Sequence, residues 1–445
     1  MGAITWPISP HCESAWDGHP ERVVRTGEGA QEGLTANRAA ATLHFGSDKV
    51  HLRNHHASRV RATHTSMGEC VMTADKLISS DSHVVEPPDL WATGIEPKFR
   101  DRAPHVVQEE DGDWWIIDGV RTNSFQGGAQ AGKRFERQEE LRPAARFADV
   151  RPGAYIPEEF IKDNETDGVY GSVIYPTEGL VLFSVPDSDL LSAIFRVYND
   201  WIADFCSAYP GRLKGIALIN VDDVPGAVKE LERARKRGLA GAMVTVYPSE
   251  ERSYDRPEYE PLWAAAQDLD MPLSLHIATN RPSPGIPLED NRRTRPSLLA
   301  NADHWVRVSL GHLIFTGVFE RYPQLRVGSV EHELSWVPHF LERMDYTYTQ
   351  RARRPWWYRF KSGMLPSDFF RRNVFLSFQE DHLGIRDRAF IGVDALMWGS
   401  DYPHTEATFP RSRQILGRIL EGVPEEERRK ITGANVARLY HFDLH

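Results

Sequence analysis

Six side chains whose types suit metal binding or acid–base chemistry close short apolar runs of this sequence. Carboxylates and neutral imidazoles together suit Zn, Mn or Fe(II), and an open coordination position leaves room for water or substrate. Residues i and i+2 of a strand share one face, so an aspartate and a histidine two apart can turn into the same site. The six are Asp81, His83, His276, Glu331, His332 and Asp401.

The runs that carry these residues read as strands of a parallel sheet. Short apolar segments alternate with longer helical patterns, which is typical of repeated βα units. Eight such units predict a (β/α)8 barrel, in which active sites form at the carboxyl ends of the strands, so the six residues converge there. The predicted strands are 76–81, 169–175, 213–219, 241–246, 272–276, 325–331, 373–378 and 395–401.

The clearest helix follows the second predicted strand. Apolar residues from Leu190 to Phe205 recur at helical spacing, Asp187 or Ser188 can cap the start, and Pro210-Gly211 ends the pattern. Further helices are predicted at 224–237, 257–269, 296–321, 334–350 and 425–441.

Two segments lie outside the repeated units. Residues 1–74 show no sustained periodicity and are predicted to be a poorly ordered N-terminal extension of a barrel domain at 75–445. The extension holds seven of the eighteen histidines, which we interpret as a solvated tail. An insertion at about 97–160 follows the first strand and contains DGDWWIIDG, a predicted β-hairpin. At the barrel mouth this insertion would help to roof the site.

Composition narrows the class of ligand. The formal net charge is −10 over 445 residues, and Lys and Arg form no basic stripe, which argues against nucleic acid and favours a small molecule. The three cysteines show no CxxC spacing, so neither a disulfide framework nor a cysteine zinc site is implied. No apolar run approaches a membrane span, and the start lacks a secretory signal. We expect a cytoplasmic protein without membrane contact.

The motifs together resemble the amidohydrolase superfamily, specifically the amidohydrolase-2 branch related to aminocarboxymuconate-semialdehyde decarboxylase. The resemblance covers 76 to about 441, and its carriers are DSHVVEP (81–87), SLHIA (274–278), FERYPQLRVGSVEHELSWVPHFLERMD (319–345) and GSDYPH (399–404). It implies a distorted barrel holding one divalent metal ion and an activity of hydrolysis or nonoxidative decarboxylation. It also implies that His83 and His276 are ligands and that Asp401 is both a ligand and the acid/base residue.

The sixth strand leaves two alternatives open. Alignment through YPQLRV sets Glu331 where characterised decarboxylases have a catalytic histidine, and His332 lies one step further. A slip of one residue would turn the other side chain inward. Glu331 would be an anionic ligand or base, whereas His332 would polarise the substrate and shuttle a proton. No counterpart is found for the glutamate that supports this histidine in the decarboxylases.

Several other residues are predicted with lesser roles. His382 follows the seventh strand and either faces the mouth or lies in a solvated loop. Glu86 is expected either to form a turn or hydrogen bonds or to take part in catalysis, and His404 to orient Asp401 or seal the pocket. The aromatic segment RRPWWYRF at 353–360 would either close over an aromatic substrate or form a contact between copies of the chain. A homo-oligomer, with a dimer favoured, is therefore predicted.

Metal-dependent hydrolysis of an amide, lactone, ester or thioester is the leading interpretation of the sequence. The metal would lower the pKa of bound water to about 7, Asp401 would move the proton, and His332 or His382 would stabilise the oxyanion. The alternative is nonoxidative decarboxylation of a hydroxyaryl or enoic carboxylate, in which Asp401 protonates the carbon. A barrel that binds ligand without catalysis is less favoured because no strand-end ligand has been lost.

Overall fold

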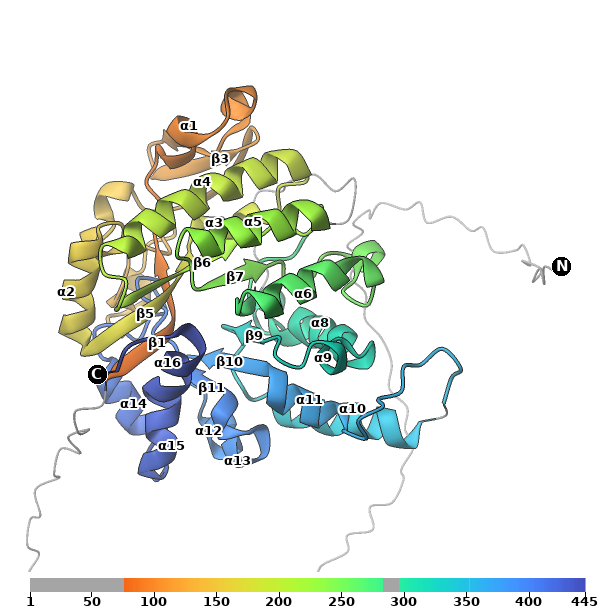
Figure 1. Cartoon of the computed structure of the whole chain (residues 1–445). Helices are drawn as coiled ribbons and strands as arrows, with labels where there is room; N and C mark the ends of the chain where they lie inside the picture. The colour runs from red at the N-terminus through yellow and green to blue at the C-terminus, as the bar shows by residue number, and fades with distance from the viewer. Residues whose placement is uncertain (1–75, 283–295, 352, 445) are drawn as a thin grey trace, which may run out of the picture. The chain divides into compact units, whose positions relative to one another are not determined.

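The structure is a computed structural model that describes residues 76–282, 296–351 and 353–444 (Figure 1). The predicted N-terminal extension, 1–74, lies outside the described residues. None of the helices in the described part of the chain combines the length and apolar character of a membrane span.

Eight parallel strands form one sheet that runs in chain order, which confirms the predicted barrel. Nearly every residue of these strands is buried. Burial on both faces explains why their sequences are apolar runs rather than alternating patterns. The strands are β1 (Leu77–Val84), β5 (Val169–Pro176), β6 (Leu213–Leu218), β7 (Gly241–Val244), β8 (Leu273–His276), β9 (Val327–Val330), β10 (Val374–Phe378) and β11 (Leu396–Trp398).

Serine side chains close the barrel between its first and last strands. Seven pairs of neighbouring strands share a hydrogen-bonded ladder, whereas β11 meets β1 through isolated bonds. The Ser79 hydroxyl accepts from the Ser400 backbone N–H at 2.9 Å and bonds the Ser400 hydroxyl at 3.2 Å. The Asp401 N–H donates to the Asp81 carbonyl at 2.8 Å. This seam brings Asp81 and Asp401 together.

The helices cover the outside of the strands (Figure 1). The Asp187 carboxylate caps α4 (Ser188–Ser207) by accepting from two backbone N–H groups, as one of the two predicted caps. The single helix predicted at 296–321 is three helices. The longer ones are α2 (Pro157–Asp167), α4 (Ser188–Ser207), α5 (Val224–Lys236), α6 (Glu260–Asp268), α8 (Asp303–Phe315), α10 (Val337–Gln350), α11 (Pro366–Asn373) and α14 (Ser412–Ile419).

Shorter helices complete the connections. A π-helical turn at Lys430–Ala434 interrupts the predicted helix 425–441. A left-handed glycine, Gly317, separates the second and third helices within 296–321. The short helices are α1 (Leu90–Gly94), α3 (Glu178–Leu182), α7 (Pro296–Leu299), α9 (Val318–Arg321), α12 (His382–Arg386), α13 (Arg388–Ile391), α15 (Glu425–Arg429) and α16 (Asn435–Tyr440).

The insertion after β1 folds as a separate small sheet. The predicted hairpin is present as β3 (Asp113–Ile117) and β4 (Val120–Ser124), and β2 (His105–Gln108) adds a third antiparallel strand. The loop after β4 touches the barrel where the Thr405 hydroxyl donates to the carbonyls of Gln126 and Gly127. Arg134 also forms an ion pair with Glu380, which follows β10. The insertion is thus anchored at the carboxyl ends of the strands, where a roof was predicted.

Candidate metal centre

Asp81 and His83 lie side by side near the end of β1. Both side chains are buried, and Asp81 Oδ1 is 3.2 Å from His83 Nε2. The pairing of β1 with β5 shifts by one residue between Ser79 and Ser82, so this strand carries a bulge just before the histidine. Bulges re-aim side chains and are common beside active sites.

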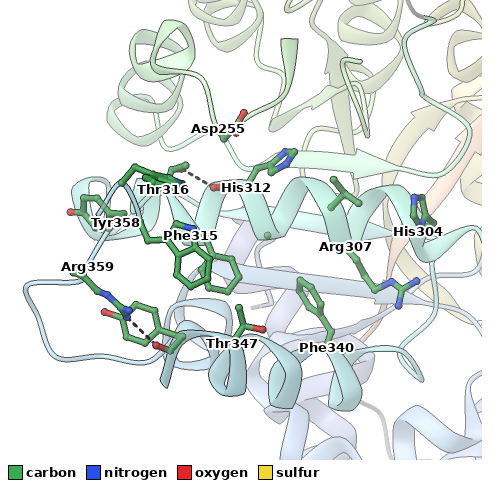
Figure 2. Close-up of a pocket in the computed structure, with 15 residues that line it drawn as sticks. Asp255, His304, Arg307, His312, Phe315, Thr316, Phe340, Thr347, Tyr358 and Arg359 are labelled. Carbon is green, nitrogen blue, oxygen red and sulfur yellow. Dashed lines mark hydrogen bonds between the residues drawn. The ribbon is translucent and has the colours of Figure 1, made fainter. Parts of the chain in front are cut away.

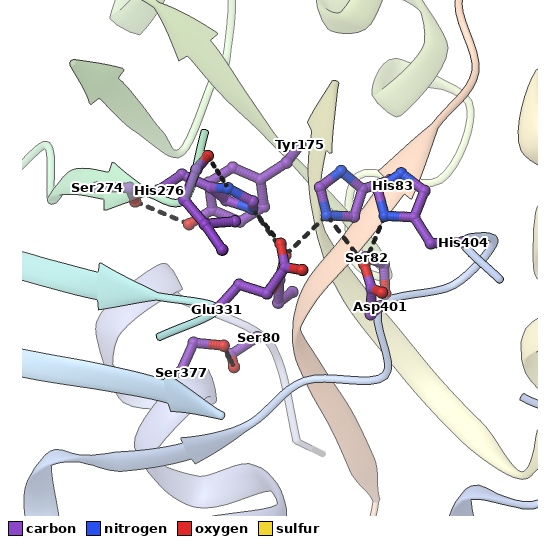
Figure 3. Close-up of polar contacts among 12 residues, drawn as sticks. Ser80, Ser82, His83, Tyr175, Ser274, His276, Glu331, Ser377, Asp401 and His404 are labelled. Atoms are coloured by element: carbon purple, nitrogen blue, oxygen red, sulfur yellow. Dashed lines mark hydrogen bonds and ion pairs between the residues drawn. The ribbon is translucent and has the colours of Figure 1, made fainter. Parts of the chain in front are cut away.

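Backbone carbonyls orient the two imidazoles. His83 Nδ1 lies 2.7 Å from the Pro176 carbonyl, and His276 Nδ1 lies 3.1 Å from the Ile277 carbonyl. A carbonyl oxygen can only accept, so each Nδ1 carries the proton and each Nε2 presents a lone pair. Metal-bound histidines in proteins commonly have this outer hydrogen bond. His276 Nε2 is 3.6 Å from Asp81 Oδ1, so the Nε2 atoms of both histidines lie close to the Asp81 carboxylate. Figure 3 shows the two imidazoles near Glu331 and Asp401.

Glu331 is the member of the sixth-strand pair that joins this group. Its Oε2 is 3.6 Å from His276 Nε2, and its side chain is 21% exposed. The residue follows the last position of β9 with φ of 62°, in the left-handed region. Such a backbone costs a non-glycine residue about 1 kcal/mol or more and is concentrated at functional sites.

His332 is buried beside the same group. Its Nδ1 lies 3.2 Å from the Ser329 hydroxyl, while its Nε2 has no hydrogen-bond partner among the described residues. Burial, with a smaller contribution from the charge of His276, lowers the pKa of His332 to about 3. The imidazole is therefore neutral at pH 7 and can exchange hydrogen bonds without carrying a charge.

Asp401 contacts the same nitrogen of His83 as Asp81 does. Its backbone is also left-handed, with φ of 57°, and its Oδ1 is 3.3 Å from His83 Nε2. His404 Nδ1 contacts the same oxygen at 2.7 Å, and His404 Nε2 is 2.9 Å from the Thr177 hydroxyl. Burial opposes protonation of His404, but Asp401 outweighs it and raises the pKa of His404. His404 thus orients Asp401, one of the two roles predicted for it.

The acidic side chains at this centre lie close enough together that a positive charge among them would be stabilising. Burial would raise the pKa of Asp81, but the neighbouring imidazoles of His276 and His83 lower it well below the usual range. Burial and the charges of Asp401 and Asp81 together raise the pKa of Glu331 well above its usual value. Three buried or half-buried acids share one small space, an arrangement that a bound cation stabilises.

The donor atoms fit one divalent ion. One ligand atom each from Asp81, His83, His276 and Glu331 lies within 4.8 Å of all the others. Among the described residues, no hydrogen-bond partner satisfies either Asp81 carboxylate oxygen or either histidine Nε2, although all four atoms are buried. Asp401 Oδ1 forms ionic contacts with His404 Nδ1 and His83 Nε2 but no hydrogen bond of good geometry. Buried polar atoms left without partners are rare and costly, and shared coordination to one metal would satisfy all of them.

Two predicted residues lie elsewhere. His382 begins α12 with an exposed side chain, so the structure gives the oxyanion role predicted for it no support. Glu86 is fully buried and accepts from the backbone N–H groups of Thr177, Glu178 and Gly179 at the start of α3, in line with the hydrogen-bonding role predicted for it.

The sequence did not predict two residues that lie beside the centre, Tyr175 and Thr177. The Tyr175 ring lies 5.1 Å from that of His276 and 6.0 Å from that of His83, and its hydroxyl bonds Ser274 at 2.7 Å. Thr177 was also missed. The available signal was position, because both residues close β5 at the same end of the barrel as the other site residues.

A prominent cavity of the described chain lies away from these residues. It is a groove of about 890 Å³ between α8 and α10 that shares no lining residue with the centre (Figure 2). Trp356, Trp357, Tyr358 and Arg359 of the aromatic segment line it. The structure therefore puts this segment on the groove rather than over the proposed metal site, and the predicted contact between copies stays a prediction.

Comparisons with known proteins identify relatives over most of the barrel. The amidohydrolase family, described by one sequence model, matches residues 181–442, more than half of the chain. A gamma-resorcylate decarboxylase of Polaromonas sp. (strain JS666) is 25% identical over 275 residues, covering 58% of this chain and 80% of that protein.

Solved structures share the fold. An amidohydrolase from Mycobacterium avium subsp. paratuberculosis K-10 superposes with a TM-score of 0.66 at 21% identity, covering 82% of this chain and 98% of that one. A dihydroxybenzoic acid decarboxylase from Polaromonas sp. JS666, solved with manganese and the inhibitor 2-nitroresorcinol, gives a TM-score of 0.54 at 19% identity. It covers 82% of this chain and 97% of that one.

Proposed function

Because the chain belongs to the amidohydrolase family, we propose that it is a metal-dependent nonoxidative decarboxylase of a hydroxyaryl carboxylate. The observation that carries this proposal is the convergence of the donor atoms of Asp81, His83, His276 and Glu331 within 4.8 Å, with Asp401 alongside. The sequence alone favoured hydrolysis. The relatives named as gamma-resorcylate decarboxylases favour the alternative, decarboxylation.

The ligands of the metal would be the Nε2 atoms of His83 and His276 and the carboxylates of Asp81, Glu331 and Asp401. This mixed nitrogen and oxygen set suits Mn, Zn or Fe(II), and the manganese in the related dihydroxybenzoic acid decarboxylase supports the first of these. When bound, the metal supplies a Lewis acid that attracts the substrate carboxylate and an adjacent phenolic oxygen.

Asp401 would deliver the proton that the reaction consumes. Loss of carbon dioxide leaves the electron pair of the broken C–C bond on the ring carbon, and a proton from the Asp401 carboxyl forms the new C–H bond. His404 fixes the position of that carboxyl through the 2.7 Å contact with Oδ1. His332, neutral and buried, would hold a substrate oxygen through a hydrogen bond.

The insertion would keep bulk water away from the carbanion-like ring carbon. Its loop after β4 contacts Thr405, four residues beyond Asp401, so the roof is fixed close to the proton donor. Excluding water strengthens each electrostatic interaction with the substrate.

The test assays the Mn²⁺-loaded chain on 2-hydroxybenzoate and the dihydroxybenzoates, with release of carbon dioxide as the readout. In deuterium oxide, the product should carry one deuterium at the vacated carbon. Asp401→Asn should retain Mn²⁺ and lose about 10²-fold or more in kcat. Hydrolysis of lactones or esters by a chain that releases no carbon dioxide from any hydroxybenzoate would overturn the proposal in favour of the hydrolase.

A further inference from the structure

Glu86 is a fully buried acid that the proposed reaction does not use. It lies three residues after His83, on the loop that follows β1. Its carboxylate accepts from three consecutive backbone N–H groups just after β5, those of Thr177 at 3.3 Å, Glu178 at 2.9 Å and Gly179 at 2.9 Å. Burial raises the pKa of Glu86 to about 7, although these bonds oppose the shift. An apolar side chain would avoid this cost of desolvation, so the carboxylate points to a role beyond packing.

The peptide unit that joins Pro176 to Thr177 connects Glu86 to the metal centre. The N–H of this unit, on Thr177, donates to Glu86. Its carbonyl, on Pro176, lies 2.7 Å from His83 Nδ1. The peptide is trans and planar, so the N–H and the carbonyl point in opposite directions from one rigid unit. Glu86 and His83 therefore hold the two ends of the same peptide plane, and a rotation of that plane would break both contacts.

The carboxylate of Glu86 also polarises this peptide unit. Hydrogen bonds to a charged acceptor are the stronger kind, and hydrogen bonds in a chain strengthen one another. A negative charge at the N–H therefore makes the Pro176 carbonyl a better acceptor for the His83 Nδ1–H. An outer hydrogen bond of this kind fixes the ring and raises the basicity of the nitrogen that binds the metal. Glu86 thus acts on His83 Nε2 from a distance.

The side chain of Thr177 extends the same arrangement to a second imidazole. Its hydroxyl is 2.9 Å from His404 Nε2, and His404 Nδ1 is 2.7 Å from Asp401 Oδ1. The His404 ring lies against that of His83, with centroids 4.1 Å apart and planes at 31° (Figure 3). The segment that Glu86 fixes therefore contacts one imidazole through a carbonyl and the other through a hydroxyl.

We propose that Glu86 is a positioning residue that fixes the orientation of two imidazoles at the metal centre. It acts on His83 through the peptide that joins Pro176 to Thr177. It acts on His404, and so on the carboxylate of Asp401, through the hydroxyl of Thr177. This inference rests on the metal site that the proposed function requires, but not on the reaction at that site.

The experiment measures the dissociation constant of Mn²⁺ for the full-length chain by titration calorimetry, without substrate. Glu86→Gln keeps the size of the side chain but turns an amide NH₂ toward at least one of the three backbone donors. Loss of such an outer partner costs about 10- to 100-fold in metal affinity, so Mn²⁺ should bind at least about tenfold more weakly. Thr177→Val removes the hydroxyl and should weaken binding by about three- to tenfold, whereas Thr177→Ser should stay within about twofold of the wild type.

Asp345→Asn is the matched control, because it also changes an acid to an amide. The Asp345 carboxylate accepts from the backbone N–H and the hydroxyl of Ser367 at the start of α11, rather than from residues of the centre. This variant should bind Mn²⁺ as tightly as the wild type. Urea unfolding of the chelator-stripped proteins reports any loss of stability separately from the affinity for Mn²⁺.

Several outcomes would overturn the inference. A Glu86→Gln protein that is less stable in urea but binds Mn²⁺ as tightly as the wild type has lost only a structural contact. Equal weakening of Mn²⁺ binding by Asp345→Asn, or equal affinities of Thr177→Val and Thr177→Ser, would also contradict it. If Glu86→Gln does not fold, the comparison of the two Thr177 variants decides.

The two proposals can fail separately. If the expected shifts in Mn²⁺ affinity appear but the wild type releases no carbon dioxide from any hydroxybenzoate, the positioning role stands and the proposed decarboxylation is wrong. If carbon dioxide is released and the shifts are absent, the reverse holds. A wild-type chain that binds no Mn²⁺ overturns both.

Discussion

Replacing Glu331 with glutamine should stabilise the metal-free protein against unfolding. It should also reduce the further stabilisation that the protein gains on binding metal. The ligand atoms of Glu331 and Asp81 lie no more than 4.8 Å apart. Two unit charges at that limit repel by about 3.5 kcal/mol at an effective dielectric constant near 20. Glu331 can remove most of this cost by taking up a proton, and its side chain is 21% exposed, so the gain in unfolding free energy should be well below that figure.

The same substitution removes a carboxylate ligand. A metal at 100 times its dissociation constant stabilises a protein by about 2.7 kcal/mol, and a 100-fold weaker site loses nearly all of that increment. The assay is urea unfolding of chelator-stripped protein with and without added Mn²⁺. We expect Glu331→Gln to unfold at higher urea concentration than the wild type when stripped, and to gain much less on addition of Mn²⁺.

Glu333 provides the matched control. It lies two residues away, also has positive φ, and burial raises its pKa to about 7, but its carboxylate accepts from the backbone N–H groups of Gln379 and Glu380. Glu333→Gln should leave the Mn²⁺ increment at its wild-type size. A stripped Glu331→Gln protein that is less stable than the wild type, with an intact Mn²⁺ increment, would refute the idea that Glu331 faces the metal.

Three further predictions follow from particular contacts. A Cβ added at Gly399 would lie 2.5 Å from Asp81 Cβ, so Gly399→Ala should displace Asp81 and abolish the Mn²⁺ increment in unfolding. His404→Gln should lower kcat by about 10- to 100-fold with little change in KM, measured by carbon dioxide release, because it loosens the orientation of Asp401. Burial raises the pKa of Asp167 from 3.8 to about 6, so its protonated form stabilises the fold fully below about pH 3.8. That contribution, about 3 kcal/mol, is lost as the pH rises through 6, and urea unfolding of Asp167→Asn should show the slope removed.

The strands were predictable because strands that are buried on both faces have recognisably apolar sequences. A parallel strand covered on both faces must be apolar along its length, and each of the eight predicted runs overlaps an observed strand. The breaks within helices were less predictable. The left-handed Gly317 ends one helix inside a continuous apolar pattern, and the sequence does not mark whether a glycine continues or ends a helix.

The choice between Glu331 and His332 could not be made from the alternation of side-chain direction along a strand, because that alternation ends with the strand. Strand β9 ends at Val330, and Glu331 adopts φ of 62°, so the inward direction of its side chain comes from a left-handed backbone rather than from alternation. Asp401, with φ of 57°, is turned inward by the same device three residues after β11. At both positions the backbone accepts strain of about 1 kcal/mol or more to aim a carboxylate at the histidines.

That strain argues for a role that packing cannot supply. Turning carboxylates toward two histidine lone pairs and a third acid brings like charges together, and burial and this repulsion raise the pKa of Glu331. Such an arrangement lowers the stability of the fold unless a bound cation offsets both the backbone strain and the repulsion between the carboxylates. The left-handed Glu331 and Asp401, together with the unsatisfied Nε2 atoms of His83 and His276, therefore point to the metal more strongly than residue type alone.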